Sequence, residues 1–144
     1  MEEGEFEEYK EEIEKLSSPH KVELTLTCKD LADKDMFGKS DPYAVVYIKG
    51  EKDPIWMKLG VTETKQNDLN PHFDKVFTIN YLFERNQIIR VEVFDKDDDT
   101  EQEASSDDII GSTDCALNKL LVAPNQQIKE ELLNGTHKAG RIYL

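Results

Sequence analysis

Apolar and polar residues alternate with a period of two along most of the chain, which is typical of β-strands that bury one face. The pattern predicts eight strands, at residues 22–28, 43–48, 57–64, 73–80, 88–94, 109–115, 127–133 and 141–144. Turn signals separate several of these runs, at Asp53-Pro54, Asn70-Pro71 and Gly140. Since only one helical turn is expected among them, at 116–122, the pattern favours an all-β fold, an eight-stranded antiparallel β-sandwich.

The first 20 residues follow a different pattern. They carry eight Glu and two Lys, and apolar residues recur at steps of three and four, at Phe6, Tyr9, Ile13 and Leu16. This spacing places the four on one face of a short amphipathic acidic helix. A frayed tail is the alternative, because a helix of about four turns is marginal without a surface to pack on. We therefore expect an acidic N-terminal helix or tail at 1–20 and one domain at 21–144.

Composition narrows the classes of function. The formal net charge is −13, which should repel DNA, RNA and bare anionic membranes, so nucleic-acid binding is not expected. The two cysteines, Cys28 and Cys115, lie far apart and are expected to be buried free thiols. No run approaches the roughly 20 apolar residues of a membrane-spanning helix, and no signal peptide is evident. We expect a cytoplasmic protein.

Acidic residues gather in two of the predicted connections, "DKDMFGKSDP" and "DKDDDTEQEASSDD". In an antiparallel sandwich whose chain reverses at each connection, the first-to-second, third-to-fourth and fifth-to-sixth connections tend to lie at the same end. The two acidic connections would together bring five carboxylates to one rim: Asp35, Asp41, Asp95, Asp97 and Asp108. Their mutual repulsion would be relieved by a bound cation, and carboxylates with loop carbonyls are the oxygen ligands that calcium prefers.

Two other classes of site are not expected. The run from Asp95 is not an EF-hand loop, because Thr100 and Ser106 stand where that loop needs Gly and a bidentate Glu. The chain is not expected to be an enzyme. The predicted framework brings no Ser, Cys or paired carboxylate to any of its three histidines, and the chain has no Gly-rich phosphate loop.

The segments "DMFGKSDPY", "NDLNPHFDKVF" and "VFDKD" followed by "DDIIG" resemble a C2 domain over residues 21–144. The segments "WMKLGVTETKQNDLNPHF" and "YLFERNQIIRVEVFDKD", with the lengthened loop before "SDDIIG", are similar to the first C2 domain of copines. In that family two C2 domains precede a von Willebrand A domain. Whether this chain is a piece of such a protein or stands alone is left open. Its first strand begins at Lys21 and its last ends the chain, which favours the type II topology.

The resemblance implies a calcium-dependent phospholipid-binding module in signalling, recruited peripherally from the cytoplasm to anionic membranes. Carried over by position, it assigns Ca²⁺ ligands to Asp35 and Asp41 in the first connection and to Asp95, Asp97 and Asp108 in the fifth. Lipid headgroups would complete the coordination.

Two apolar residues, Met36 and Phe37, stand between the first two acidic ligands, where a loop tip is usually polar. We expect them to enter the lipid headgroup region, with packing beneath the loop as the alternative. The competing function is a protein–protein interaction module, with protein partners held in part by the acidic N-terminal helix and with calcium structural or absent.

Overall fold

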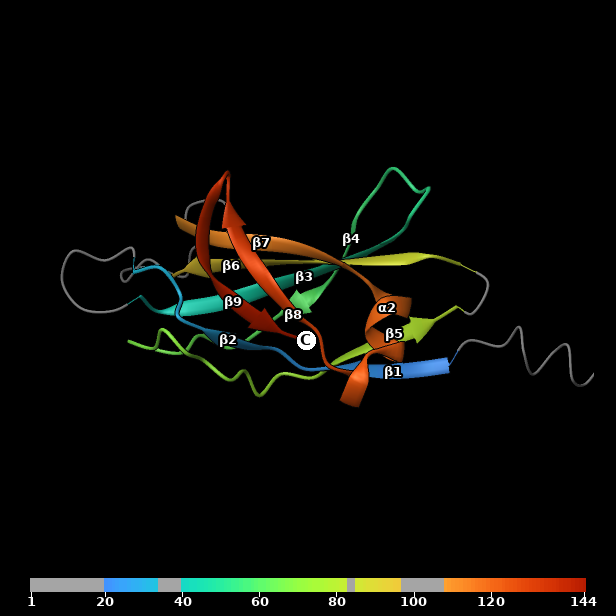
Figure 1. The fold of residues 1–144 in the computed structure, drawn as a ribbon, viewed down its shortest axis with the longest axis horizontal. Helices are drawn as coiled ribbons and strands as arrows, with labels where there is room; N and C mark the ends of the chain where they lie inside the picture. Colours follow the sequence, from blue (N-terminus) through green and yellow to red (C-terminus); the bar gives the residue numbers. More distant parts are fainter. Residues whose placement is uncertain (1–19, 34–39, 83–84, 97–107) are drawn as a thin grey trace, which may run out of the picture.

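The computed structural model describes residues 20–33, 40–82, 85–96 and 108–144 (Figure 1). This part of the chain forms nine strands, one short α-helix and one turn of 3-10 helix. They are β1 (His20–Leu24), β2 (Thr27–Lys29), β3 (Pro42–Gly50), β4 (Met57–Val61), β5 (Phe77–Tyr81), β6 (Gln87–Asp95), β7 (Asp108–Ala116), α2 (Leu117–Val122), η2 (Pro124–Gln126), β8 (Lys129–Asn134) and β9 (His137–Tyr143).

The strands form two sheets, and each pairing between the described strands is antiparallel (Figure 1). The larger sheet has the order β2-β9-β8-β7-β6-β3-β4, and the smaller pairs β1 with β5. Side chains from both sheets share one buried core, with Leu24, Phe77 and Ile79 from the smaller sheet facing residues such as Val46 and Val91 of the larger. The predicted all-β, antiparallel fold is confirmed.

The run predicted as one strand at 22–28 passes from one sheet to the other. Its first part, β1, pairs with β5, whereas its second part, β2, pairs with β9. Leu26 lies between the two parts, is fully buried, and accepts a backbone hydrogen bond from Phe73 at 3.0 Å. The alternation predicted the buried face of this run, but it carries no information about a change of partner, because pairing depends on residues far away in the sequence.

Gly140 does not mark a turn, contrary to the sequence prediction. It lies inside β9 with φ +126°, and a Cβ at this position would come within 2.9 Å of the Asp30 carbonyl oxygen, so only glycine permits the close approach. The turn between β8 and β9 falls at Gly135, which has φ +63°. Asn134 pairs with His137, so the two turn residues are Gly135 and Thr136, and a glycine at the first of them is a hairpin signal that the prediction did not use. As a result β9 begins at His137, ahead of the predicted strand.

Other predictions from the pattern are confirmed. The expected helical turn is α2, which buries Leu117 and Leu120 against the core. Cys28 and Cys115 are buried free thiols, and burial raises the pKa of Cys28 to about 12. Within the described ranges we find no helix with the length and apolar character that crossing a bilayer would require. The segment 1–19, where the acidic helix or tail is expected, lies outside the described residues.

The connection between β4 and β5 is long and irregular, and Phe73 anchors it in the core. The strand predicted at 73–80 begins only at Phe77, while Phe73 itself is fully buried. Replacing Phe73 with Ala should therefore lower the free energy of unfolding by about 3 to 5 kcal/mol, because it leaves a cavity beneath the connection. Urea unfolding followed by the fluorescence of Trp56, the single tryptophan, measures this change.

The matched control is Val122→Ala, an apolar truncation at a side chain that is 83% exposed. This control should change the free energy of unfolding by less than about 0.5 kcal/mol. An equally small effect of Phe73→Ala would contradict the anchoring role.

Candidate functional site

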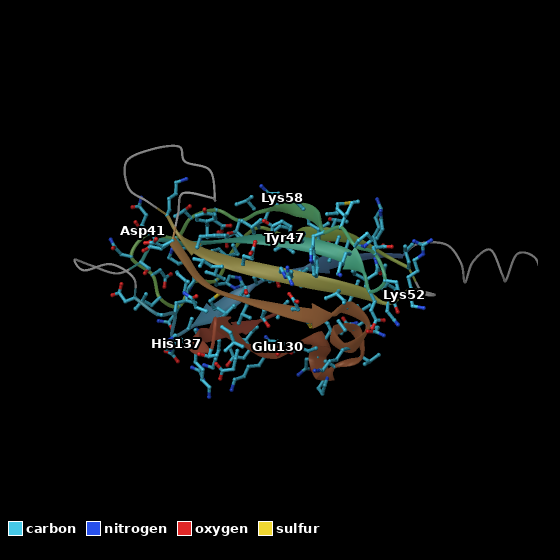
Figure 2. The ribbon with its side chains drawn as sticks, turned by 90° about the horizontal axis from the view of Figure 1, so that it is seen from above. Asp41, Tyr47, Lys52, Lys58, Glu130 and His137 are labelled. Carbon is cyan, nitrogen blue, oxygen red and sulfur yellow. The ribbon has the colours of Figure 1, made fainter. Side chains whose placement is uncertain are left out.

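Three of the predicted site residues lie at the ends of adjacent strands of the larger sheet. Asp41 directly precedes β3, Asp95 ends β6 and Asp108 begins β7. Asp95 is paired in register with Pro42 on one side and with Asp108 on the other. We call these three residues the acidic rim; Figure 2 labels Asp41 at this end of the molecule. The prediction that the two acidic connections share one end is supported by the described parts that flank them.

A direct hydrogen bond joins two of the rim residues. The backbone N–H of Asp41 donates to Oδ1 of Asp95 at 2.9 Å, and the backbone N–H of Lys96 donates to the Asp41 carbonyl at 2.9 Å. Asp95 is only 5% exposed. A carboxylate this deeply buried is costly unless hydrogen bonds or a cation compensate it. The start of β3 and the end of β6 are thereby held together beneath the rim.

The connection between β4 and β5 packs against the same rim. Oδ1 of Asp41 accepts a hydrogen bond from the backbone N–H of Asn67 at 2.7 Å, and Asn67 has φ +51°. The backbone N–H of Asp68 donates to the carbonyl of Ser40 at 3.1 Å. These contacts add a third connection to the two predicted from the acidic motifs.

This third connection contains the residues that sequence reasoning missed. Asn67 and Asp68 contact Asp41 and its neighbour Ser40 through their backbone N–H groups, and Asn70 Oδ1 accepts the backbone N–H of Asp30 at 2.9 Å. The signal was present in "KQNDLNP", where polar residues suited to turns gather before a proline. The reversal of the chain places this connection at the same end as the two acidic ones, as predicted, but a short polar run does not show which residues of the other loops it contacts.

A carboxylate from the β4–β5 connection holds this loop in shape. Glu63 accepts the backbone N–H groups of Asp74 at 2.6 Å and of Lys75 at 3.2 Å, and Lys65 Nζ lies 3.4 Å from its Oε2. Burial alone would raise the pKa of Glu63. The two N–H groups and the Lys65 ammonium outweigh it, so the pKa lies below the usual range for this carboxyl.

A small apolar cluster supports the rim from the outer face of the larger sheet. The rings of Tyr43 and Phe94 stack with centroids 5.5 Å apart and an interplanar angle of 20°, and Ile109 packs against them. The register between β6 and β7 shifts just here, so that Phe94 faces Ile109 and Asp95 faces Asp108. Such an irregularity redirects side chains at a strand end, and it sets Asp95 opposite Asp108 in the register of the two strands.

The remaining predicted site residues lie outside the described part of the chain. These are Asp35, Met36, Phe37 and Asp97, in the segments 34–39 and 97–107. Their predicted roles stay predictions.

The chemistry of the described rim is that of oxygen donors. Carboxylates suit a hard cation such as Ca²⁺, whereas zinc and copper prefer His and Cys side chains. Within the described ranges no three His, Cys, Asp or Glu side chains come close enough together to hold a metal ion. The donor type therefore fits calcium, and a complete site would need ligands beyond the described residues.

The largest hollow of the described surface lies elsewhere, between β1 and α2, with a volume of about 650 Å³. Its lining includes Lys21, Glu23 and Gln127 and none of the rim residues. We do not assign the candidate chemistry to it.

Comparison with known proteins places residues 21–133 within the model of the C2 domain family. Copine-D from Dictyostelium discoideum is 33% identical over 124 residues, which cover 85% of this chain and 23% of that protein. Copine-A from the same organism is 39% identical over 118 residues, which cover 82% of this chain and 18% of that protein. The chain thus spans about a fifth of the length of these two relatives, and the predicted resemblance to copines is confirmed.

Solved structures agree on the fold. A C2 domain of plant Extended Synaptotagmin 1 has a TM-score of 0.63 and 22% identity, covering 88% of this chain and 90% of that domain. A calcium-bound pair of C2 domains from Extended-Synaptotagmin 2 gives a TM-score of 0.58 at 19% identity, covering 88% of this chain and 44% of that one. At such low identity the likeness establishes the fold alone.

The low pKa of Glu63 predicts a pH-dependent contribution to stability. A depressed pKa in the folded state means that Glu63 stabilises the fold above its unfolded pKa, near 4.5, and that this contribution is lost as the pH falls through the folded value. Glu63→Gln should therefore lower the free energy of unfolding by about 1 kcal/mol at pH 7, a figure reduced for its partial exposure, and by progressively less in acid.

Urea unfolding at a series of pH values between neutral and strongly acidic measures this difference. Glu131→Gln, on the exposed side of β8, makes the same change of charge without these contacts. A difference between wild type and Glu63→Gln that stayed constant down to the lowest pH would contradict the role of the ionised carboxylate.

Proposed function

The chain belongs to the C2 domain family, and from this premise we propose that it attaches to anionic phospholipid membranes in a calcium-dependent way. Copines are among its relatives, and C2 domains commonly bind membranes and calcium. The proposal concerns this domain; the activity of any longer protein that contains it is a separate question.

The observation that carries the proposal is the meeting of Asp41, Asp95 and Asp108 at adjacent strand ends. The segment 34–39 leads directly towards Asp41, and the segment 97–107 runs between Asp95 and Asp108. Both segments begin or end within a few residues of the rim. We therefore assign the five predicted carboxylates to one calcium site: Asp35, Asp41, Asp95, Asp97 and Asp108.

Asp95 and Asp108 have different roles in the proposed site. Asp95 is buried and bonded to the backbone of Asp41, so it sets the position of the strand ends. Asp108 is exposed and presents its carboxylate outwards. When bound, Ca²⁺ supplies a hard positive charge that carboxylates and lipid phosphate oxygens can share. Without it, the rim repels anionic headgroups, since residues 21–144 hold 23 acidic and 16 basic side chains.

Met36 and Phe37 complete the proposed membrane contact. They stand in the same short segment as Asp35, so a loop that delivers Asp35 to the rim also delivers two apolar side chains to its border. Apolar residues at this border would enter the headgroup region once the charge repulsion is relieved. We infer that the attachment is peripheral and made from the cytoplasm.

The number of strands, the topology and the bounds of the domain are also part of the proposal. If β1 and β2 count as two parts of one strand, the described strands number eight, and the first and last are neighbours through the pairing of β2 with β9. This neighbourhood is compatible with the predicted type II topology, which we keep as part of the proposal. It also supports a domain at 21–144 that follows an N-terminal segment at 1–20.

Vesicle sedimentation tests the function. The wild-type chain should sediment with phosphatidylserine vesicles at millimolar calcium and stay in the supernatant with a chelator. The double variant Asp35→Asn, Asp97→Asn removes two ligands, each worth more than about 1.4 kcal/mol, and should bind vesicles at least about tenfold more weakly. These two positions leave the described hydrogen bonds of Asp41 and Asp95 untouched.

The matched control is Asp53→Asn, Glu131→Gln, which removes the same two charges from positions away from the rim and should bind like the wild type. The variant Met36→Ser, Phe37→Ser should keep its response to calcium but sediment less. If the wild type stays in the supernatant at millimolar calcium, the membrane function is wrong and the protein-interaction function takes its place.

Calcium should also stabilise the fold, since ligands that bind only the folded chain raise its melting temperature. At a calcium concentration of 100 times the dissociation constant, the gain is about 2.7 kcal/mol, or roughly 5 to 10 °C for a domain of this size. Differential scanning calorimetry with calcium or chelator measures the shift. The variant Asp35→Asn, Asp97→Asn should lose most of it, and an unchanged wild-type curve would argue against a calcium site.

A further inference from the structure

An apolar groove opens between the two sheets at the end away from the acidic rim. Figure 2 labels Asp41 at one end of the molecule and Lys52, in the turn after β3, at the other. The groove is about 350 Å³ in volume. We call it the mouth groove and define it by the apolar side chains that line it: Ile48, Ile55, Met57, Leu59, Ile79 and Leu82.

Two large apolar side chains at the mouth groove are exposed to solvent. Ile55 is 77% exposed and Met57 is 68% exposed, and both adjoin the edge strand β4, which pairs only with β3 among the described strands. An apolar patch on an open sheet edge invites a covering segment. The exposed side chains therefore point to an occupant that is not among the described residues.

The groove offers little to a small polar ligand. Gln87 is the buried polar side chain in its lining, and both ends of its amide are used, with Oε1 accepting from the Leu82 backbone at 3.0 Å and Nε2 donating to the Asn80 carbonyl at 3.1 Å. Throughout the described residues no buried side-chain polar atom lacks a partner. The occupant should accordingly be apolar where it meets the floor of the groove.

The border of the groove carries cations and carboxylates. Lys49 and Arg85 line the groove together with Asp53, and Lys52 and Glu51 line the adjoining hollow. Among the described residues, none of the three cations forms an ion pair with a carboxylate, and Nζ of Lys49 lies 5.0 Å from the centre of the Trp56 ring. Lys52 and Arg85 are therefore open to glutamates of an occupant.

The N-terminal segment starts from the same end of the molecule. His20, the first residue of β1, is paired with Tyr81, and the next residue along, Leu82, lines the groove. Residues 1–19 therefore continue from a point beside it. Within the first 20 residues, apolar side chains recur at helical spacing, at Phe6, Tyr9, Ile13 and Leu16, among eight Glu and two Lys. The segment can therefore present apolar side chains to the groove and carboxylates to the cations at its border.

The length expected for the helix also matches the length of β4 beside the groove. A helix from Phe6 to Leu16 would be about 16 Å long, and the five residues of β4 extend over roughly the same distance. The three residues between Leu16 and His20 give the chain room to turn back onto the groove. Docking would supply the surface that such a short helix needs in order to be stable.

We propose that residues 1–19 form an amphipathic helix that docks in the mouth groove of its own domain. The apolar face covers Ile55 and Met57, and the glutamates lie against Lys52 and Arg85. The acidic rim repels this segment. The hollow between β1 and α2 exposes more polar than apolar surface, so it suits the apolar face of the segment less well. This docking is independent of the proposed binding of calcium and lipid.

A spin label on the full chain tests the proposal. The variant Glu12→Cys carries a nitroxide on the polar side of the segment, and the wild-type chain treated in the same way shows whether the buried Cys28 and Cys115 take up label. With the label oxidised, the backbone amide signals of residues 55–59 and 80–82 should be lost in a nitrogen-15 correlation spectrum, and they should return on reduction. Adding Met57→Glu should restore these signals in the oxidised state.

The matched control for Met57→Glu is Val122→Glu, which makes the same substitution at an exposed apolar side chain of α2 and should leave the loss of signal intact. Ile13→Glu, which alters only the segment, should also restore the signals if the segment docks through its apolar face. Signals unaffected by the label, or lost at residues 117–127 or at the rim instead, would overturn the proposal.

A mixed sample separates docking within one chain from docking between two. Unlabelled chains enriched in nitrogen-15 are combined with spin-labelled chains of natural isotope content. Full signal at residues 55–59 is expected, because each segment binds its own domain. Loss of signal in this sample would show that a second copy occupies the groove and would overturn the intramolecular proposal.

Discussion

The buried carboxylate of Asp95 is the constraint on which the candidate site depends. Burying a carboxylate that is 5% exposed costs free energy, which its interactions must offset. The backbone N–H of Asp41 offsets part of this cost by donating a hydrogen bond to Oδ1 of Asp95 at 2.9 Å. The hydrogen bond joins the start of β3 to the end of β6. The Asp41 side chain in turn accepts the N–H of Asn67, which brings the β4–β5 connection to the same place. One buried acid thus joins the start of β3, the end of β6 and the β4–β5 connection at a shared edge.

Order at this edge also depends on parts of the chain that carry no charge. The Tyr43 and Phe94 rings stack below the rim, and Phe73 anchors the irregular β4–β5 connection in the core. Glu63 then closes that connection by accepting two of its backbone N–H groups. An irregular loop keeps a defined shape only when its backbone groups find partners, and here a carboxylate supplies them. The rim is therefore supported from below and from the side.

The fold separates two surfaces of different character. Strand ends at one extremity gather carboxylates, while the other extremity holds an apolar groove bordered by both cations and carboxylates. This separation follows from the antiparallel pairing, because successive connections between antiparallel strands fall at opposite ends of a sheet. A cation-dependent contact at one end can then operate without disturbing a segment docked at the other.

The pattern of apolar residues along the chain was enough to predict most of the strands, the short helix α2, the buried thiols and the shared end of the strands that flank the two acidic connections. These features depend on local alternation and on the reversal of the chain at each connection. The pattern could not show that the run at 22–28 changes sheets, that Gly140 lies against the Asp30 carbonyl, or that Asn67 meets Asp41. Those facts were decided by tertiary structure, because each depends on the approach of segments that are distant in sequence, and local periodicity contains no information about which segments meet.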